Sequence, residues 1–149
     1  MKNILVLNGP NLNLLGTRQP ETYGNTTLQD VEDNCAKTAA ELGVEITFQQ
    51  SNHEGVLIDA IQNAASDFDG IVMNAGGFTH TSVAIMDAIG SVDTPVLELH
   101  VSNIHRREEF RQHSYLSKVC IGMISGLGVN GYPLAIRAMH AYLNDQNPG

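Results

Sequence analysis

Hydrophobic positions along the chain alternate between short continuous runs and longer segments with helical spacing. The short runs predict five strands, at residues 3–8, 44–49, 71–74, 96–100 and 118–123. The longer segments predict helices at 26–42, 55–66, 81–89 and 133–143, with a helical turn at 105–112. Thr26 with Gln29 is a candidate capping box for the first helix, and Gly43 is placed to end it.

This alternation predicts an α/β fold with a parallel sheet covered by helices on both faces. By analogy with flavodoxin-like, doubly wound proteins, we expect the strand order 2-1-3-4-5. The absence of a linker, repeat or low-complexity tract predicts a single domain over residues 1–149. Ligands of such sheets bind beyond the carboxyl ends of the strands, where the strand order reverses. We therefore expect the site beyond strands one and three.

Unusual residues, most of them polar, follow the strands at that end of the predicted sheet. They are Asn8, Asn11, Asn13, Arg18 and Tyr23 after the first strand; Asn52, His53 and Glu54 after the second; Asn74, Gly76, Gly77 and His80 after the third; and Glu98, His100, Val101 and Ser102 at the fourth. The loops at the opposite end read as ordinary turns. This asymmetry predicts a small-molecule site before any motif is considered.

Some of these residues are also compatible with a purely structural role, namely Asn8, Asn13, the Gly76-Gly77 pair and the Glu98 and His100 pair. Gly76-Gly77 could open a helix for packing alone or for binding an anion. We expect His53 and His105 at the surface. The charged run 106–109 is expected to be solvated and paired within itself, which leaves Arg111 free to point elsewhere.

Composition narrows the classes of protein that fit. The net charge of −8 argues against nucleic acid or an anionic membrane as the main partner. No apolar run approaches the roughly 18 residues of a membrane span, and the first apolar run is too short for a signal peptide. Cys35 and Cys120 are expected to be reduced core thiols, so a cytoplasmic protein is predicted.

Two patterns that suggest other ligands fail on spacing. The glycines of 126–131 match a dinucleotide-binding pattern, but that pattern also needs a second strand and an acidic residue about 20 residues on, and the sequence does not offer them, so a structural turn is expected. The six histidines include no HxH or HExxH spacing, and no metal site is expected.

Longer motifs then indicate a family. The segments NGPNLNLLGTRQPETYG (8–24), SNHEGVLID (51–59), THTSVAIMDA (79–88), ELHVSNIHRREEFRQHS (98–114) and GLGVNGYPLA (126–135) resemble type II 3-dehydroquinate dehydratase, in order from residue 2 to about 142. The resemblance implies dehydration of 3-dehydroquinate to 3-dehydroshikimate without a cofactor. It also implies a homododecamer built as a tetramer of trimers.

The resemblance also assigns roles. It implies Tyr23 as the base, activated by Arg18, on a segment between Gly16 and Gly24 that would close over the substrate. Asn11 would support the enolate oxygen, and His100, oriented by Glu98, would protonate the leaving hydroxyl. The implied substrate-binding residues are Asn74, His80, Val101, Ser102, Arg111 and, from a neighbouring subunit, Asp87.

Departures from the family pattern and rival functions stay open at this stage. Met86 stands where the family has arginine, and Gly77-Phe78 replaces the commoner Ala-Tyr. The lysines, at positions 2, 37 and 118, are not expected at the carboxyl end of the sheet, which disfavours imine chemistry. The alternatives are a catalytically silent family member that acts as a binding protein, and a flavodoxin-like nucleotide or flavin binder.

Overall fold

The computed structural model describes residues 1–17, 21 and 24–145. Parallel strands form one sheet in the order β2-β1-β3-β4-β5, as predicted. The strands are β1 (Asn3–Asn8), β2 (Glu45–Gln50), β3 (Gly70–Asn74), β4 (Val96–His100) and β5 (Gly122–Ser125). The order reverses between β1 and β3, so the switch point lies where the sequence predicted it.

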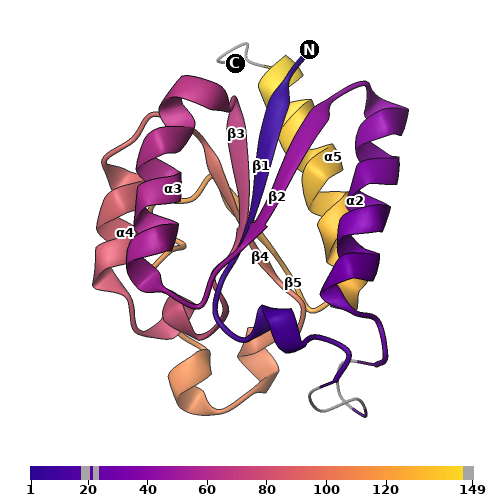
Figure 1. Cartoon of the computed structure of the whole chain (residues 1–149). Helices are drawn as coiled ribbons and strands as arrows, with labels where there is room; N and C mark the ends of the chain where they lie inside the picture. The colour runs from indigo at the N-terminus through magenta and orange to yellow at the C-terminus, as the bar shows by residue number, and fades with distance from the viewer. Residues whose placement is uncertain (18–20, 22–23, 146–149) are drawn as a thin grey trace.

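Helices cover both faces of this sheet (Figure 1). They are α2 (Leu28–Leu42) and α5 (Gly131–Asn144) on one face, and α3 (Glu54–Asp67) and α4 (Val83–Gly90) on the other. Short 3₁₀ helices follow several strands: η1 (Leu12–Leu14), η2 (Gly76–His80), η3 (Ile104–Arg106), η4 (Glu109–Arg111) and η5 (Gly128–Asn130). In Figure 1 the carboxyl ends of the strands point downward, toward η1 and the turns η3 and η4.

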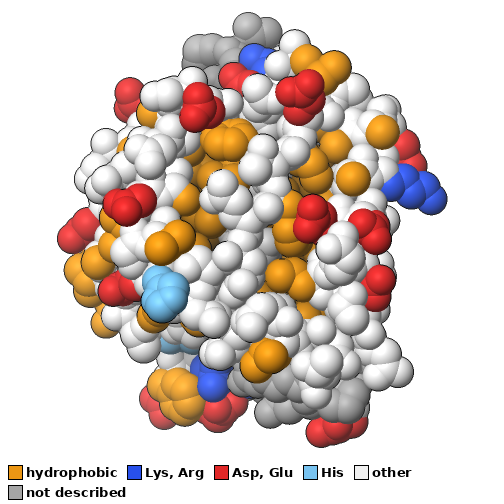
Figure 2. Space-filling view, viewed as in Figure 1, with side chains coloured by type: hydrophobic (Ala, Val, Ile, Leu, Met, Phe, Trp, Pro, Cys, Tyr) orange, Lys and Arg blue, Asp and Glu red, His pale blue; other side chains and the backbone are white. Residues whose placement is uncertain are grey.

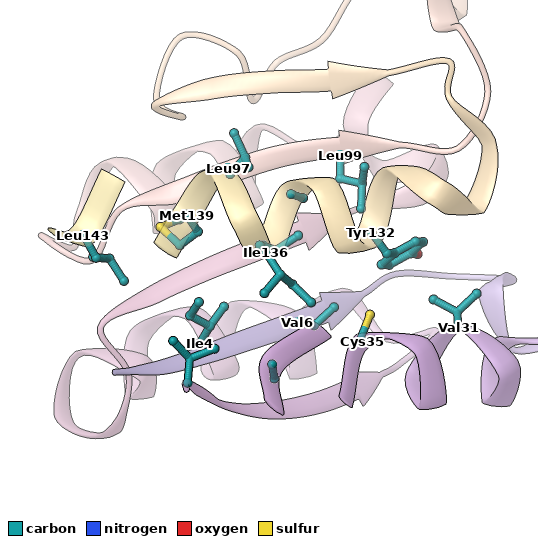
Figure 3. Packing of buried hydrophobic residues seen from close by; sticks show 14 of the residues in the cluster. Ile4, Val6, Val31, Cys35, Leu97, Leu99, Tyr132, Ile136, Met139 and Leu143 are labelled. Atoms are coloured by element: carbon teal, nitrogen blue, oxygen red, sulfur yellow. The ribbon is translucent and has the colours of Figure 1, made fainter. Parts of the chain in front are cut away.

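The central strand β1 divides its side chains between two hydrophobic layers. Ile4 and Val6 pack with α2 and α5, and Leu5 and Leu7 pack with α3 and α4. Figure 3 shows the first layer, in which Tyr132 and other α5 residues face β1 and β4. Burial of each large apolar side chain contributes about 1.5–3 kcal/mol. Because both faces of β1 are buried, its side chains on either face gain from being apolar, and this explains the continuous apolar run.

Three local predictions were wrong in detail. The capping box of α2 is Thr27 with Asp30, one residue beyond the predicted pair, because the Asp30 carboxylate accepts from the Thr27 backbone N–H at 3.0 Å. The last strand is β5 at Gly122–Ser125, because the predicted residues before it form a turn anchored by the buried Leu116. The predicted helical turn at 105–112 is split into η3 and η4.

Other expectations hold. Residues 126–130 form a turn and η5, and Gly131 begins α5, in agreement with a structural role. Cys35 and Cys120 are both unbridged. No helix in the described part of the chain combines the length and the apolar character needed to cross a bilayer. Figure 2 shows acidic side chains scattered over the visible face with few basic ones among them.

The loops after β1 and β3 are held in close contact by glycines. The Gly9 N–H donates to the Asn74 carbonyl at 2.8 Å and so extends the pairing of the two strands. A Cβ at Gly9 would lie 2.4 Å from the Ala75 carbonyl oxygen, and one at Gly76, where φ is 60°, would lie 3.0 Å from the Pro10 carbonyl oxygen. The two loops can meet at the switch point only without these side chains.

Gly9→Ala therefore tests the packing beneath the site. A methyl group here meets backbone rather than a flexible side chain, so we expect the free energy of unfolding to fall by about 1–3 kcal/mol. Gly55→Ala in α3 is the matched control, because a Cβ there meets nothing within 4 Å. Urea unfolding at one protein concentration measures both; equal midpoints for the two variants would contradict the close approach.

Candidate active site

A pocket of about 210 Å³ opens at the carboxyl end of the sheet, between the loops that follow β1, β3 and β4. It is lined by the predicted residues Asn11, Asn74, His80, His100, Val101, Ser102 and Arg111. These residues are far apart in sequence and come from three loops and a 3₁₀ turn. The parallel sheet brings them together because all its strands end on the same side.

His100 and Glu98, both on β4, form a buried pair. The His100 Nε2 donates to Glu98 Oε2 at 2.5 Å, and the side chain of Glu98 is fully buried. A carboxylate only accepts hydrogen bonds, so it selects the tautomer or cation that carries a proton on Nε2. Nδ1 is then the ring nitrogen left for the pocket, and it can donate a proton when the imidazole is charged.

Two serines that the sequence analysis did not single out complete the surroundings of Glu98. Ser114 Oγ donates to Glu98 Oε2 and Ser117 Oγ donates to Oε1, both at 2.7 Å. Burial raises the pKa of the Glu98 carboxyl, but the hydrogen bonds from His100 and both serines lower it, and together they outweigh burial. Glu98 is therefore held as a carboxylate although its side chain is fully buried.

His80 lies across from His100, with ring centroids 6.5 Å apart. Its Nδ1 lies 2.8 Å from the His113 carbonyl oxygen and must donate to it, so Nε2 is an acceptor in the neutral ring. Burial lowers the pKa of His80, and the His113 hydrogen bond only partly opposes this. A neutral His80 can accept a hydrogen bond from a hydroxyl group in the pocket.

The loop that carries Asn11 is fixed by β2 and the residues after it. Asn11 has a left-handed backbone with φ of 69°, and its N–H donates to Asn52 Oδ1 at 2.9 Å. Gln50 Nε2 donates to the Gly9 carbonyl at 3.1 Å. Asn13 contacts the same Gln50, at the limit of hydrogen-bond distance. The amides after β1 and β2 thus support the loop, and Asn11 lines the pocket.

An anion could bind where β4 ends. Among the described residues, none accepts a hydrogen bond from the backbone N–H of Val101 or Ser102, and both residues line the pocket. Asn74 Nδ2 donates to the Tyr132 hydroxyl at 3.0 Å, and its second hydrogen remains available. These donors suit a carboxylate, which accepts several hydrogen bonds at once.

Two arginines make the pocket locally positive. Arg111 lines it as predicted, but Arg111 is not free of the charged run: its Nε donates to Glu108 Oε2 at 3.0 Å. Arg107, expected in a solvated run, also lines the pocket, 3.4 Å from Ser102 Oγ. Helical spacing could not have placed Arg107, because residues 105–112 form two separate 3₁₀ turns rather than one helix. The Arg111 hydrogen bond lowers the pKa of the exposed Glu108.

Some predicted residues lie elsewhere. Asp87 is exposed on α4 and does not line the pocket. Arg18 and Tyr23 lie outside the described residues, and so does most of the segment expected to close over the substrate. His53 and His105 are exposed, as predicted. No group of three or more histidine, cysteine, aspartate or glutamate residues within the described ranges is arranged to hold a metal ion.

Glu98→Gln should reveal the charge that the serines stabilise. The carboxylate has a lowered pKa in the folded protein, so its stabilisation is present above its ordinary value of 4.5 and is lost as the pH falls through the lowered value. We expect wild type to be more stable at pH 7 by about 1–3 kcal/mol, with the gap narrowing in acid. Urea unfolding across pH measures this. Glu109→Gln, at an exposed position, is the control; a gap independent of pH would contradict the assignment.

Comparisons with known proteins agree with this geometry. The model of the family "Dehydroquinase class II" matches residues 2–140. The chain is 58% identical over 141 residues to a 3-dehydroquinate dehydratase of Dinoroseobacter shibae, with 95% of this chain and 94% of the relative covered. It is 57% identical over 143 residues to the catabolic 3-dehydroquinase 1 of Aspergillus fumigatus, with 96% of this chain and 94% of the relative covered.

A solved structure has the same fold. The type II dehydroquinase from Propionibacterium acnes superposes with a TM-score of 0.91 at 41% sequence identity, covering 95% of this chain and 97% of that one. The fold, the pocket and the family match over nearly the whole chain lead to one conclusion. This chain belongs to the class II dehydroquinase family.

Proposed function

We propose that the protein is a lyase that dehydrates 3-dehydroquinate to 3-dehydroshikimate by anti elimination through an enolate. Family membership supports the reaction, because the relatives carry that activity in their names. The observation that carries the proposal is the buried Glu98–His100 pair at the wall of a pocket rich in donors. The pair supplies an oriented acid where a β-hydroxyl must leave.

The elimination needs a base that takes a proton from the carbon next to the ketone. Tyr23 is the proposed base, as a phenolate favoured by the nearby charge of Arg18. An ordinary tyrosine has a pKa of about 10, so it needs such a neighbour to act near neutrality. This assignment rests on the family resemblance of residues 8–24, since Arg18 and Tyr23 are not among the described residues.

The other steps fall to described residues. Asn11 would hold a water or donate directly to the enolate oxygen. His100 would deliver the Nδ1 proton to the leaving hydroxyl, while Glu98 stabilises the charged imidazole. The substrate carboxylate would bind the N–H groups of Val101 and Ser102 and the Asn74 amide. The ring hydroxyls would bind His80 Nε2 and the Arg111 guanidinium, which also line the pocket.

A Schiff-base route finds no support in this pocket. An imine intermediate needs a lysine amine within reach of the ketone. No lysine is found among the described residues that line the pocket. The enolate route uses acid–base groups alone and matches the donors present.

The proposal extends to assembly. We propose a homododecamer, a tetramer of trimers, in which Asp87 of one subunit reaches the pocket of the next. Its exposed position on α4, away from its own pocket, is compatible with such a role. Biosynthesis of aromatic compounds and breakdown of quinate are both left open as its role: one relative is named a catabolic 3-dehydroquinase, and the name of another states the reaction alone. A cytoplasmic location remains an expectation from the sequence.

His100→Gln and Tyr23→Phe test the acid and the base. Each variant should lower kcat by about 100- to 10,000-fold, because general acid or base catalysis supplies that range. The assay follows the ultraviolet absorbance of the conjugated enone after addition of 3-dehydroquinate. Tyr142→Phe, at an exposed tyrosine of α5 that does not line the pocket, is the control. A wild-type rate for Tyr23→Phe would show that the base is misassigned.

Asp87 can be tested by complementation between subunits. Alone, Asp87→Ala should raise KM about 10-fold, and His100→Gln should be nearly inactive. Co-expression would restore wild-type pockets, about a quarter of the total, because each pocket can draw His100 from one variant and Asp87 from the other. Light scattering should give a mass twelve times the 16.1 kDa subunit. Activity of the mixture equal to the average of the separate variants would contradict a shared site.

A further inference from the structure

A chain of buried hydrogen bonds runs beneath the pocket and links β2, β1, α5 and β3. Asn8 Nδ2 donates to the Gln49 carbonyl at 3.1 Å. The Tyr132 hydroxyl donates to Asn8 Oδ1 at 2.6 Å and accepts from Asn74 Nδ2 at 3.0 Å. Asn74 Oδ1 in turn accepts from the Gly76 N–H at 3.2 Å. Asn8, Tyr132 and Asn74 are 0%, 1% and 4% exposed, so water cannot replace these bonds.

The chain of hydrogen bonds has only one consistent donor-to-acceptor direction. It begins at a backbone carbonyl, which can only accept, and it ends at a backbone N–H, which can only donate. A flipped Asn8 amide would set its oxygen against the Gln49 carbonyl. A flipped Asn74 amide would set its NH₂ against the Gly76 N–H. Each flip would leave buried groups unpaired, which is costly out of water.

Tyr132 joins the two amides because a hydroxyl can donate and accept at once. Burial raises the pKa of the Tyr132 phenol far above its ordinary value, although the Asn74 hydrogen bond opposes this. The hydroxyl therefore stays protonated near neutral pH and keeps its hydrogen for Asn8. The same burial separates Tyr132 from the proposed role of Tyr23, since a phenol so hard to ionise is no base.

The direction of these hydrogen bonds decides which atom of the Asn74 amide remains available to the pocket. One Nδ2 hydrogen is used by Tyr132, and Oδ1 is engaged by Gly76. The second Nδ2 hydrogen is the remaining donor, and Asn74 lines the pocket beside the free N–H groups of Val101 and Ser102. A flipped amide would offer its carbonyl oxygen from the same position and would repel a carboxylate.

We propose that Tyr132 is a positioning residue whose hydroxyl holds the Asn74 amide with an N–H, not a carbonyl, available for the anionic group of the ligand. The inference rests on the proposed function for the identity of that ligand and deepens it. Tyr132 and Asn8 touch no substrate, since neither lines the pocket. They act on specificity through Asn74.

The test compares two ligands that differ in one charge. Quinate is a saturated polyol carboxylate, and quinamide carries a neutral carboxamide in its place. Isothermal calorimetry measures both affinities without turnover. Tyr132→Phe should reduce the preference for quinate over quinamide by about 10-fold, the equivalent of one hydrogen bond, and should raise KM more than it lowers kcat.

Two further variants keep the test decisive. Asn8→Ala removes the acceptor of the Tyr132 hydroxyl, whose hydrogen is then free to turn toward Asn74 and favour the flipped amide. It should lose the same preference while it retains the Tyr132 ring, and it stands in if Tyr132→Phe fails to fold. Ile136→Val trims the same buried cluster one turn along α5 and should lose stability without losing the preference.

The outcomes separate the two levels of the proposal. An unchanged preference in Tyr132→Phe or in Asn8→Ala overturns the positioning role. An equal loss in Ile136→Val also overturns it, since packing alone would then account for the effect. A wild-type protein that binds quinate but does not convert 3-dehydroquinate would instead overturn the proposed function and leave the amide orientation standing.

Discussion

Buried polar side chains lie at or near the ends of three neighbouring strands of the sheet, and each of them must find its hydrogen-bond partners away from water. Asn8 ends β1, Asn74 ends β3, and Glu98 lies two residues from the close of β4. Unpaired, any one of them would cost a substantial part of a marginal folding free energy. Their partners come from α5 and from residues 114–117, so these distant segments are held where the pocket needs them.

The same requirement fixes the charge of Glu98 and the orientation of the hydrogen-bond donors in the pocket. Glu98 is satisfied by three donors, and it stays ionised and fixes the tautomer of His100. The Asn74 amide donates from Nδ2 to Tyr132 and accepts at Oδ1 from Gly76, so the orientation of its second Nδ2 hydrogen is fixed. Preorganised donors of this kind stabilise developing charge without reorganisation. The hydrogen bonds that satisfy these buried groups are thus the same bonds on which the proposed catalysis depends.

The sign of the charge differs between the pocket and the rest of the protein. The chain carries a net charge of −8, and acidic side chains are scattered over the face seen in Figure 2. The described lining contains two arginines and two histidines and no acidic residue. Both arginines are near Glu108, which anchors them and offsets part of their charge. Attraction of an anion is therefore a local property of the pocket, with little help from the whole molecule.

The strands, the helices and the location of the site could be read from the sequence because they depend on local patterns. Continuous apolar runs predicted strands buried on both faces, and polar residues after those runs predicted the pocket. The errors in the predicted element bounds fell where a contact with a residue outside the local pattern determines the structure. Asp30 moved the cap of α2 by one residue, and the contacts of Leu116 turned a β-rich run before β5 into a turn.

By itself, the sequence determined the parallel α/β sheet, the end of it where the pocket opens, and the residues Asn11, Asn74, His80, His100 and Arg111 as pocket groups. Only the tertiary structure decided that Arg107 joins them, that Ser114 and Ser117 hold Glu98, and that Tyr132 bridges Asn8 and Asn74. The physical reason is that hydrogen-bond direction and charge pairing depend on atoms separated by up to 124 positions in the chain. No local sequence pattern shows which buried polar atoms will become hydrogen-bond partners.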